Sequence, residues 1–430
     1  MVSDMREIKN SGIPWIGDMP LNWIVCPFPM YFESIVDYRG KTPEKVDEGI
    51  FLVTARNIKD GKMNYDNAQE YVRQEDYDII MHRGLPHIGD VLFTTEAPLG
   101  EVANVDRTDI ALAQRVIKFS GKRGVLDNYF LKYWIYNPAF QDDLKSFGTG
   151  STAQGIKASK LNQLKLVLPP FSEQQCIVTF LDSKCAEIDA LSSDIQSEIE
   201  TLEAYKRSVV FDVVEHGVEN FEFKETDSDV WTTIPANWEL VDIKYIFEIV
   251  KRIAGKEGYD IIAITQKGLK HKDISSNEGQ LASNYSGYQF VYPGDYAMNH
   301  MDLLTGWVDL SDKFGVTSPD YRVFRLRNPE RFDRKFYKYV MQCCYMNRIF
   351  YSMGHGVSNL GRWRLQTSTF NNFKIPVPSY EEQVKLGLFL DEQTSEINSI
   401  ISQKQEQLAV LADYKKSLIY EYVTGKKEVT

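Results

Sequence analysis

The chain carries one long segment twice. A run that begins with Pro-Pro-Phe-Ser-Glu-Gln at residue 169 and reaches Phe-Leu-Asp at 180–182 returns from residue 378, with Phe-Leu-Asp at 389–391. The offset of 209 residues, as from Phe180 to Phe389, holds without a gap beyond residue 205. A repeat of nearly half the chain is too long for a solenoid, so we predict a duplicated unit of domain plus helix with pseudo-twofold organisation.

Both copies of the segment read as one long helix. Ser172 and Ser379 lie at its start, each with Gln or Glu three residues later, which predicts a capping box. Apolar residues then recur about every 3.5 positions, the coiled-coil period, over roughly 60 Å of helix. A single stripe of this kind is typical of a buried core helix, but two in phase favour a coiled coil. We expect the seam to contain Leu181, Ile188, Leu191, Ile195, Leu202, Leu390, Ile397, Ile400, Leu408 and Leu411, with Thr394 and Lys404 as polar exceptions.

A second repeated signature opens each half of the chain. Pro-x-x-Trp ends at Trp23 and again at Trp238, and roughly 140 residues of mixed character follow each copy. The pattern predicts an α+β protein, in which two mixed α/β domains are joined by two long helices that form an antiparallel coiled coil. The expected segments are a first domain at 1–168, a helical spacer at 169–217, a second domain at 218–377 and a second spacer at 378–430.

Composition excludes several classes of protein. No run approaches the roughly 18 apolar residues of a membrane span, and the N-terminal residues lack an apolar signal core, so we expect a cytoplasmic protein without membrane contact. The 5 cysteines include no Cys-x-x-Cys pair, which argues against zinc, and the 6 histidines are scattered singly, so we expect no metal site.

The net charge of -11 is unevenly distributed. The two helical segments account for -10 of it, while the remainder of the chain is close to neutral. Affinity for nucleic acid would therefore depend on local clusters of basic side chains, and net charge neither proves nor excludes it.

Three short strings resemble active-site motifs, and each lacks a residue that the chemistry needs. Leu168 precedes Pro-Pro-Phe where an amino-methyltransferase loop has Asn or Asp, and Ile156 replaces the lysine of a phosphate-binding loop. Asp320, Asp333 and Lys335 fit the loose spacing of metal-dependent nucleases, but the first half of the chain has no counterpart. We expect no catalysis by this chain, with a free-standing magnesium-dependent DNA endonuclease and a protein-binding scaffold as alternatives.

The two variable regions, each closed by a helix with Glu-Gln, Phe-Leu-Asp and Tyr-Lys-Arg/Lys-Ser, resemble the specificity subunit of Type I restriction-modification enzymes. Pro-x-x-Trp and the terminal Tyr-Val-Thr-Gly-Lys at 422–426 strengthen the resemblance, although the first helix ends differently, at Glu215-His216-Gly217. The resemblance implies a non-catalytic DNA-recognition subunit. Each of its two target recognition domains would read one half of a split, asymmetric sequence, and the helices would set the gap between the halves.

The resemblance also implies partners: double-stranded DNA, two methyltransferase subunits and the restriction and translocase subunits. S-adenosylmethionine and ATP are expected on those subunits, with no cofactor on this chain.

Side chains that contact phosphates or base edges are Lys, Arg, Asn, Gln, Ser and Thr in exposed loops. Paired loops in the two halves offer such residues, and their sequences differ, so the two half-sites should differ too. The candidate DNA-binding residues are Arg39, Lys41, Arg56, Asn57, Lys59, Thr152, Gln154 and Lys157 in the first half, and Gln266, Lys267, Ser358, Asn359, Arg362 and Arg364 in the second.

Overall fold

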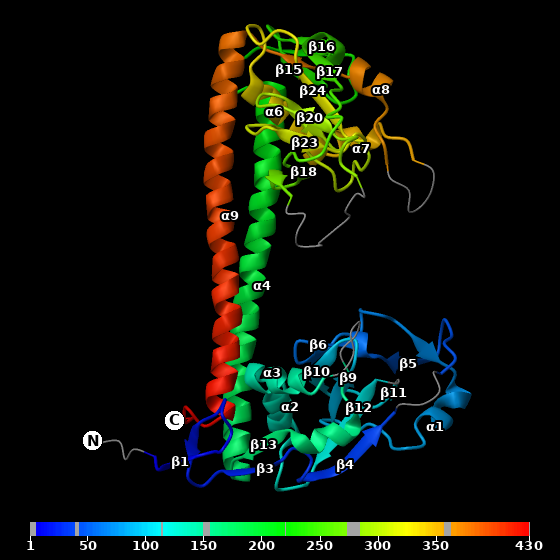
Figure 1. Cartoon of the computed structure of the whole chain (residues 1–430), viewed down its shortest axis with the longest axis vertical. Helices are drawn as coiled ribbons and strands as arrows, with labels where there is room; N and C mark the ends of the chain where they lie inside the picture. The colour runs from blue at the N-terminus through cyan, green and yellow to red at the C-terminus, as the bar shows by residue number, and fades with distance from the viewer. Residues whose placement is uncertain are drawn as a thin grey trace. The chain divides into compact units, whose positions relative to one another are not determined.

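The computed structural model describes residues 6–38, 43–112, 115–148, 155–219, 221–272, 284–356 and 363–429. Contacts divide the chain into two compact units: unit 1 comprises residues 1–194 and 406–430, and unit 2 comprises residues 195–405. Each unit therefore holds one globular domain and a part of both long helices, as the colours along the chain show (Figure 1). The domain limits predicted from the sequence differ, because they place each long helix in a segment of its own. They stay a prediction.

A four-stranded antiparallel sheet lies at the centre of each domain, and its strand order is the same in both. The order is β10-β9-β12-β4 in unit 1 and β22-β21-β24-β17 in unit 2. Corresponding strands also follow one another in the same sequence order, so the two domains share one topology. The strands are β4 (Phe32–Asp37), β9 (Val91–Thr95), β10 (Leu99–Asn104), β12 (Val116–Gly121), β17 (Phe247–Val250), β21 (Tyr296–Met298), β22 (Val308–Leu310) and β24 (Arg322–Leu326).

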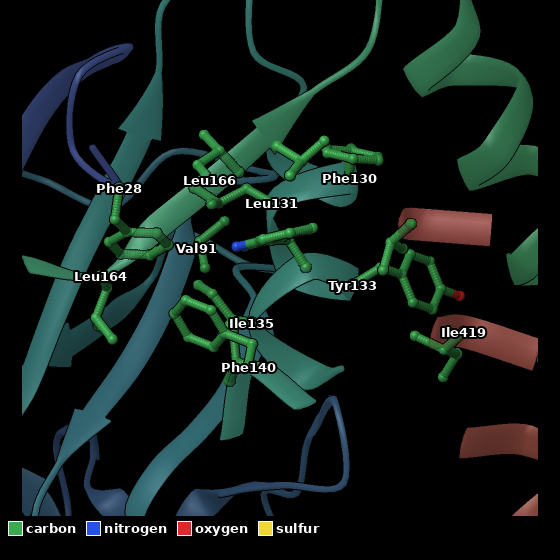
Figure 2. Packing of buried hydrophobic residues seen from close by; sticks show 14 of the residues in the cluster. Phe28, Val91, Phe130, Leu131, Tyr133, Ile135, Phe140, Leu164, Leu166 and Ile419 are labelled. Atoms are coloured by element: carbon green, nitrogen blue, oxygen red, sulfur yellow. The ribbon is translucent and has the colours of Figure 1, made fainter. Parts of the chain in front are cut away.

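A helix packs on each sheet: α2 (Asn128–Tyr136) in unit 1 and α6 (Arg334–Met346) in unit 2. Figure 2 shows Leu131 and Ile135 of α2 pointing into the domain core, while Tyr133 points the opposite way, toward Ile419 of α9. One short helix thus joins the sheet to the long helices. The smaller helices that follow are α3 (Pro138–Ser146) and α7 (Ile349–Ser352).

The remaining strands differ more between the units. In unit 1, β5 (Ile50–Val53) pairs with β8 (Tyr71–Val72) and, in parallel, with β11 (Ile110–Leu112). In unit 2 the parallel contact shrinks to one bridge between Ile261 and Val316. Unit 2 has instead a hairpin of β18 (Ile262–Thr265) and β19 (Gly268–His271), and β20 (Gln289–Val291) pairs with β23 (Gly315–Thr317), whereas unit 1 has a shorter hairpin of β6 (Ile58–Lys59) and β7 (Lys62–Met63).

Short ladders lead into each domain and into each long helix. The first are the hairpins β1 (Ile8–Asn10) with β2 (Asp18–Pro20) and β14 (Phe223–Glu225) with β15 (Thr233–Pro235). The second are β3 (Ile24–Pro27) with β13 (Lys165–Leu168) and β16 (Glu239–Asp242) with β25 (Lys374–Val377). The short elements that complete the description are η1 (Ala55–Asn57), η2 (Gln74–Asp76), α1 (Tyr77–Ile80), η3 (Ala158–Gln163), α5 (Ile243–Ile246) and α8 (Thr367–Asn372).

The two repeated segments form single helices, α4 (Phe171–His216) and α9 (Tyr380–Val423). Ser379 caps α9, since its Oγ accepts from the backbone N–H of Glu382 at 3.3 Å. The capping-box prediction is wrong for α4, because that helix begins at Phe171, directly after Pro170 and before Ser172.

The helices run antiparallel within each unit. In unit 1 the ring centroids of Phe180 and Tyr422 lie 4.4 Å apart, and Lys415 donates to Asp189 at 2.6 Å. In unit 2 Glu198 pairs with Lys404, and Lys206 donates to Asn398 at 2.9 Å. In both units, residues later in α4 contact residues earlier in α9. This is the antiparallel coiled coil that the sequence predicts.

The seam agrees with the sequence except at two matched positions. Leu181, Ile188, Ile195, Leu390 and Ile397 are buried, and Leu202, Leu408 and Leu411 are half-buried. Leu191 and Ile400 are 48% and 37% exposed, so the prediction that they belong to the seam is wrong. The seam contains the next residue in each helix, Ser192 and Ile401. The alternating spacing of four and three residues continues unbroken through these positions, so Leu191 and Ile400 lie one residue outside it.

A buried tryptophan ties each domain to the start of its following helix. The Nε1 atoms of Trp23 and Trp238 donate to Glu173 and Glu382, each at 2.9 Å, and both rings are fully buried. The repeated Pro-x-x-Trp and Glu-Gln motifs therefore meet in space. A buried indole N–H needs such a partner, since leaving it unpaired costs about 1–3 kcal/mol.

The next residue of each helix, a buried glutamine, adds a second tie. Gln174 donates to the carbonyl of Pro169 at 2.9 Å and accepts from the backbone N–H of Asp127 at 2.8 Å. Gln383 makes the same pair of bonds, to Pro378 at 2.9 Å and from Asp333 at 2.8 Å. Asp127 and Asp333 in turn cap α2 and α6.

The aspartate of each Phe-Leu-Asp motif binds a tyrosine of the same short helix. Tyr133 donates to Asp182 at 2.6 Å, and Tyr339 donates to Asp391 at 2.8 Å. Burial would raise the pKa of Asp391, but hydrogen bonds from Lys335, Lys338 and Tyr339 outweigh it and lower that pKa to about 2.

A glycine in the left-handed region follows each long helix, Gly217 (φ 76°) directly after α4 and Gly425 (φ 72°) two residues after α9. Gly217 lies against Trp238, and Gly425 lies against Trp23 and Pro20, so a side chain at Gly425 would lie 2.4 Å from the proline ring. Each domain thus contacts the start of one helix and the end of the other.

A pair of leucine substitutions tests the seam. Leu181→Ala should lower the free energy of unfolding by about 2–5 kcal/mol, because Leu181 is fully buried, whereas Leu191→Ala should change it by about 0.5 kcal/mol or less. Urea unfolding followed by circular dichroism measures both. Equal losses from the two substitutions would contradict the assigned seam.

The charge on Asp391 should make stability depend on pH. Because its pKa in the folded chain lies below the unfolded value of about 3.9, its contribution is present above pH 4 and is lost as the pH falls toward 2. Asp391→Asn should therefore lower the urea midpoint at pH 7, and the difference from wild type should shrink between pH 4 and pH 2. The exposed neighbour Glu392 provides the control, Glu392→Gln, and a difference that stays constant with pH would refute the assignment.

Candidate nucleic-acid interface

The first candidate loop, in unit 1, combines a buried anchor with exposed cations. Asn57 is fully buried, and its side chain accepts from Thr54 and donates to the carbonyl of Asn64, so it holds the turn together. It does not present a surface for base contact, contrary to its place among the candidates. Arg56 is 60% exposed beside Glu70, and Lys59 is exposed at the start of the β6–β7 hairpin.

The other unit 1 candidates lie mainly outside the described residues. Lys157 is exposed directly before η3. Arg39, Lys41, Thr152 and Gln154 fall outside the described ranges, as do Ser358, Asn359 and Arg362 of unit 2.

Two unit 2 candidates lie at the turn of the β18–β19 hairpin. Gln266 and Lys267 are both exposed, and Gly268 adopts φ 93°, which allows the tight turn between them and β19. The structure therefore presents an amide and a cation on neighbouring residues of one hairpin, a combination suited to phosphate and base-edge contacts.

The described residues on either side of 357–362 pair with each other and form a stem. His355 and Arg364 pair through both backbone hydrogen bonds, at 3.0 and 3.2 Å, and the Arg364 side chain is exposed. Trp363 donates to the carbonyl of Tyr351 at 2.6 Å. A Cβ at Gly354 or Gly356 would lie 2.4 Å from the Trp363 ring, so these glycines allow the ring to pack against the loop.

A buried arginine behind this stem was not among the candidates. Arg322 donates to the carbonyl of Leu365 at 3.2 Å and to Thr367 Oγ1 at 3.3 Å, and its guanidinium lies 4.4 Å from the centre of the Phe370 ring. Burial lowers its pKa to about 10. No local pattern marks this residue, since Leu365 and Thr367, which accept its hydrogen bonds, are more than 40 positions away along the chain.

The residues that fit nuclease spacing have other contacts. Asp333 caps α6, and Lys335 pairs with Asp391 at 2.8 Å. Within the described ranges, no group of three or more His, Cys, Asp or Glu side chains is arranged to hold a metal ion. Over the same ranges, none of the helices combines the length and apolar character needed to cross a membrane.

Comparison with known proteins identifies the duplicated domain. The family model described as the Type I restriction modification DNA specificity domain matches residues 45–201 and 235–410, which together form more than half of the chain. The two matches fall on the two copies of the fold.

Individual relatives cover most of the chain at low identity. A Methanocaldococcus jannaschii protein provisionally named the type I restriction enzyme MjaX specificity subunit is 24% identical over 96% of both chains. The type I restriction enzyme MjaVIII specificity subunit of the same organism is 23% identical over 74% of both chains.

A solved structure shares the fold along nearly the whole chain. It comes from work on complex assembly and conformational transition of the type I R-M system, and it matches with a TM-score of 0.67 at 16% identity over 95% of this chain and 99% of the other. This chain therefore belongs to the Type I restriction-modification DNA specificity family, and its role is DNA sequence recognition.

Proposed function

We propose that each domain reads one half of a split, asymmetric DNA target and that the paired helices set the number of unread base pairs between the halves. The observation that carries this proposal is that one scaffold, held by the same Trp–Glu, Gln and Tyr–Asp contacts, occurs twice with different loops. Domains that share the same anchoring contacts but differ in their loops fit the recognition of two different half-sites.

Within this proposal, exposed loop residues make the DNA contacts. Arg56, Lys59 and Lys157 serve the unit 1 half-site, and Gln266, Lys267 and Arg364 serve the other. Proposed contacts that lie outside the described residues are Arg39, Lys41, Thr152, Gln154, Ser358, Asn359 and Arg362.

We propose that catalysis belongs to partner subunits: methyltransferase subunits that bind S-adenosylmethionine, and restriction subunits that bind ATP. The helix pair offers matched surfaces for such partners. Leu191 and Tyr414 are exposed on the helix pair of unit 1, and their equivalents Ile400 and Tyr205 are exposed in unit 2. Large apolar side chains left exposed at repeated positions favour two copies of one protein partner.

Methylation mapping tests the proposed function as a whole. DNA from cells that express this chain with a methyltransferase partner should carry methyl groups at one bipartite sequence, with unlike halves and a fixed gap. Methylation at a continuous site, or methylation that is unchanged without this chain, would overturn the proposal.

Loop substitutions should affect one half-site at a time. Arg56→Ala should relax selectivity in one half, and Gln266→Ala should relax it in the other, each by about 1–3 kcal/mol if the side chain contacts a base. Selection of bound duplexes from a randomised library measures both halves in one experiment. Relaxation of both halves by either substitution would contradict the assignment of one domain to each half-site.

Matched insertions test the helices as the spacer. Four residues placed after Glu198 in α4 and four before Lys404 in α9 lengthen both helices by roughly 6 Å, which is between one and two base-pair steps of about 3.4 Å. The preferred gap should increase by one or two base pairs while both half-sites stay the same. The same four residues added after Thr430 serve as the control, and an unchanged gap in the double insertion would show that the helices do not set it.

A further inference from the structure

Unit 2 contains a groove of about 760 Å³ between the β18–β19 hairpin, α6 and the helix pair. Its wall is rich in basic side chains from elements far apart in the sequence. The carboxylates that line it are Glu203 and Asp309, and the cations are Lys206, Arg207, Lys267, Lys338 and Arg348.

Most of these cations are not neutralised. Lys338 pairs with Asp391 at 2.9 Å, but Arg207, Lys267 and Arg348 are exposed and have no ion pair with any described residue. Lys206 donates to the neutral amide of Asn398 at 2.9 Å.

The carboxylates compensate little of this charge. Asp309 accepts from Gln342 at 3.1 Å and from the backbone of Leu310 at 2.9 Å. Glu203 is exposed on α4. Burial lowers the pKa of Lys206, and Glu203 offsets only part of that effect, so an added anion would favour the charged form of Lys206.

The equivalent place in unit 1 has a carboxylate where unit 2 has an amide. Lys415 corresponds to Lys206, and Asp189 corresponds to Asn398, at the same offset of 209 residues. Asp189 accepts from Lys415 at 2.6 Å and from Lys62 of the β6–β7 hairpin at 2.7 Å. Unit 1 thus neutralises its helix lysine with a carboxylate, whereas unit 2 leaves that lysine with an uncharged amide.

We propose that the groove of unit 2 binds the phosphate backbone of duplex DNA, with Lys206 and Arg207 of α4 and Lys267 of the hairpin as its contacts. This inference rests on the proposed function and adds to it a sequence-independent contact made by the helical spacer in one unit only. Two observations favour DNA as the occupant of the groove. Cations without ion pairs suit phosphate groups, and the hairpin that forms one wall carries two candidate DNA-contacting residues, Gln266 and Lys267.

Asn398→Asp is the sharpest test, because it gives unit 2 the carboxylate of unit 1 with almost no change in shape. The full chain, purified with a methyltransferase partner, is titrated with a random-sequence duplex over a series of salt concentrations. The logarithmic salt slope should weaken by about 0.9, and affinity at 0.1 M salt should fall about eightfold, because one phosphate contact is lost. Lys267→Gln should act in the same direction from the opposite wall.

The reciprocal substitution Asp189→Asn in unit 1 is the matched control, and it should not weaken binding because it releases two cations. If the wild-type complex binds the duplex but neither Asn398→Asp nor Lys267→Gln alters the slope, the groove proposal is wrong while the proposed function stands. The groove proposal is also wrong if Asn398→Asp weakens only assembly with the methyltransferase, since the groove then holds protein. A wild-type complex that binds no DNA would overturn the proposed function as well.

Discussion

The hydrogen bond from a buried tryptophan to a glutamate at the start of a long helix determines how each domain is held. Trp23 and Trp238 lie in domain cores with no exposed surface, and Glu173 and Glu382 accept from them at the same distance of 2.9 Å. The adjacent glutamine connects the first turn of the helix to the start of α2 or α6. These contacts join the start of each long helix to the helix that covers the sheet.

The contacts that anchor the domains to the long helices are separate from the residues proposed to contact DNA. The central sheet, its covering helix and the anchor residues are the same in both units, while the pairing of the remaining strands and the hairpins differ. The difference extends to the helix pair, where a carboxylate in unit 1 is replaced by an amide in unit 2 at Asn398. A scaffold of this kind can change its DNA contacts without changing how its domains are anchored.

Much of this architecture could be predicted from local sequence, and the remainder depends on residues far apart. Helix positions, most of the seam and the duplicated domain follow from periodicity and repetition. Leu191 and Ile400 lie one residue outside the unbroken heptad spacing, and an apolar residue next to a seam position cannot be told from a seam residue by its type alone. Asn57 was read as a surface residue because its turn-closing bonds to Thr54 and Asn64 are invisible in a list of polar residues. The groove around Lys206 could not be predicted, since its walls come from segments about 30 or more residues apart.

The most direct measurement replaces the second domain by a copy of the first. Because both domains use the same anchors, a chain in which residues 6–168 also stand in place of residues 221–377 should fold and should still assemble with a methyltransferase partner. Methylation mapping should then show a target whose two halves are the same half-site. A target that keeps its original unlike halves, or a folded and assembled chimera that recognises only one half, would contradict an account based on two interchangeable readers.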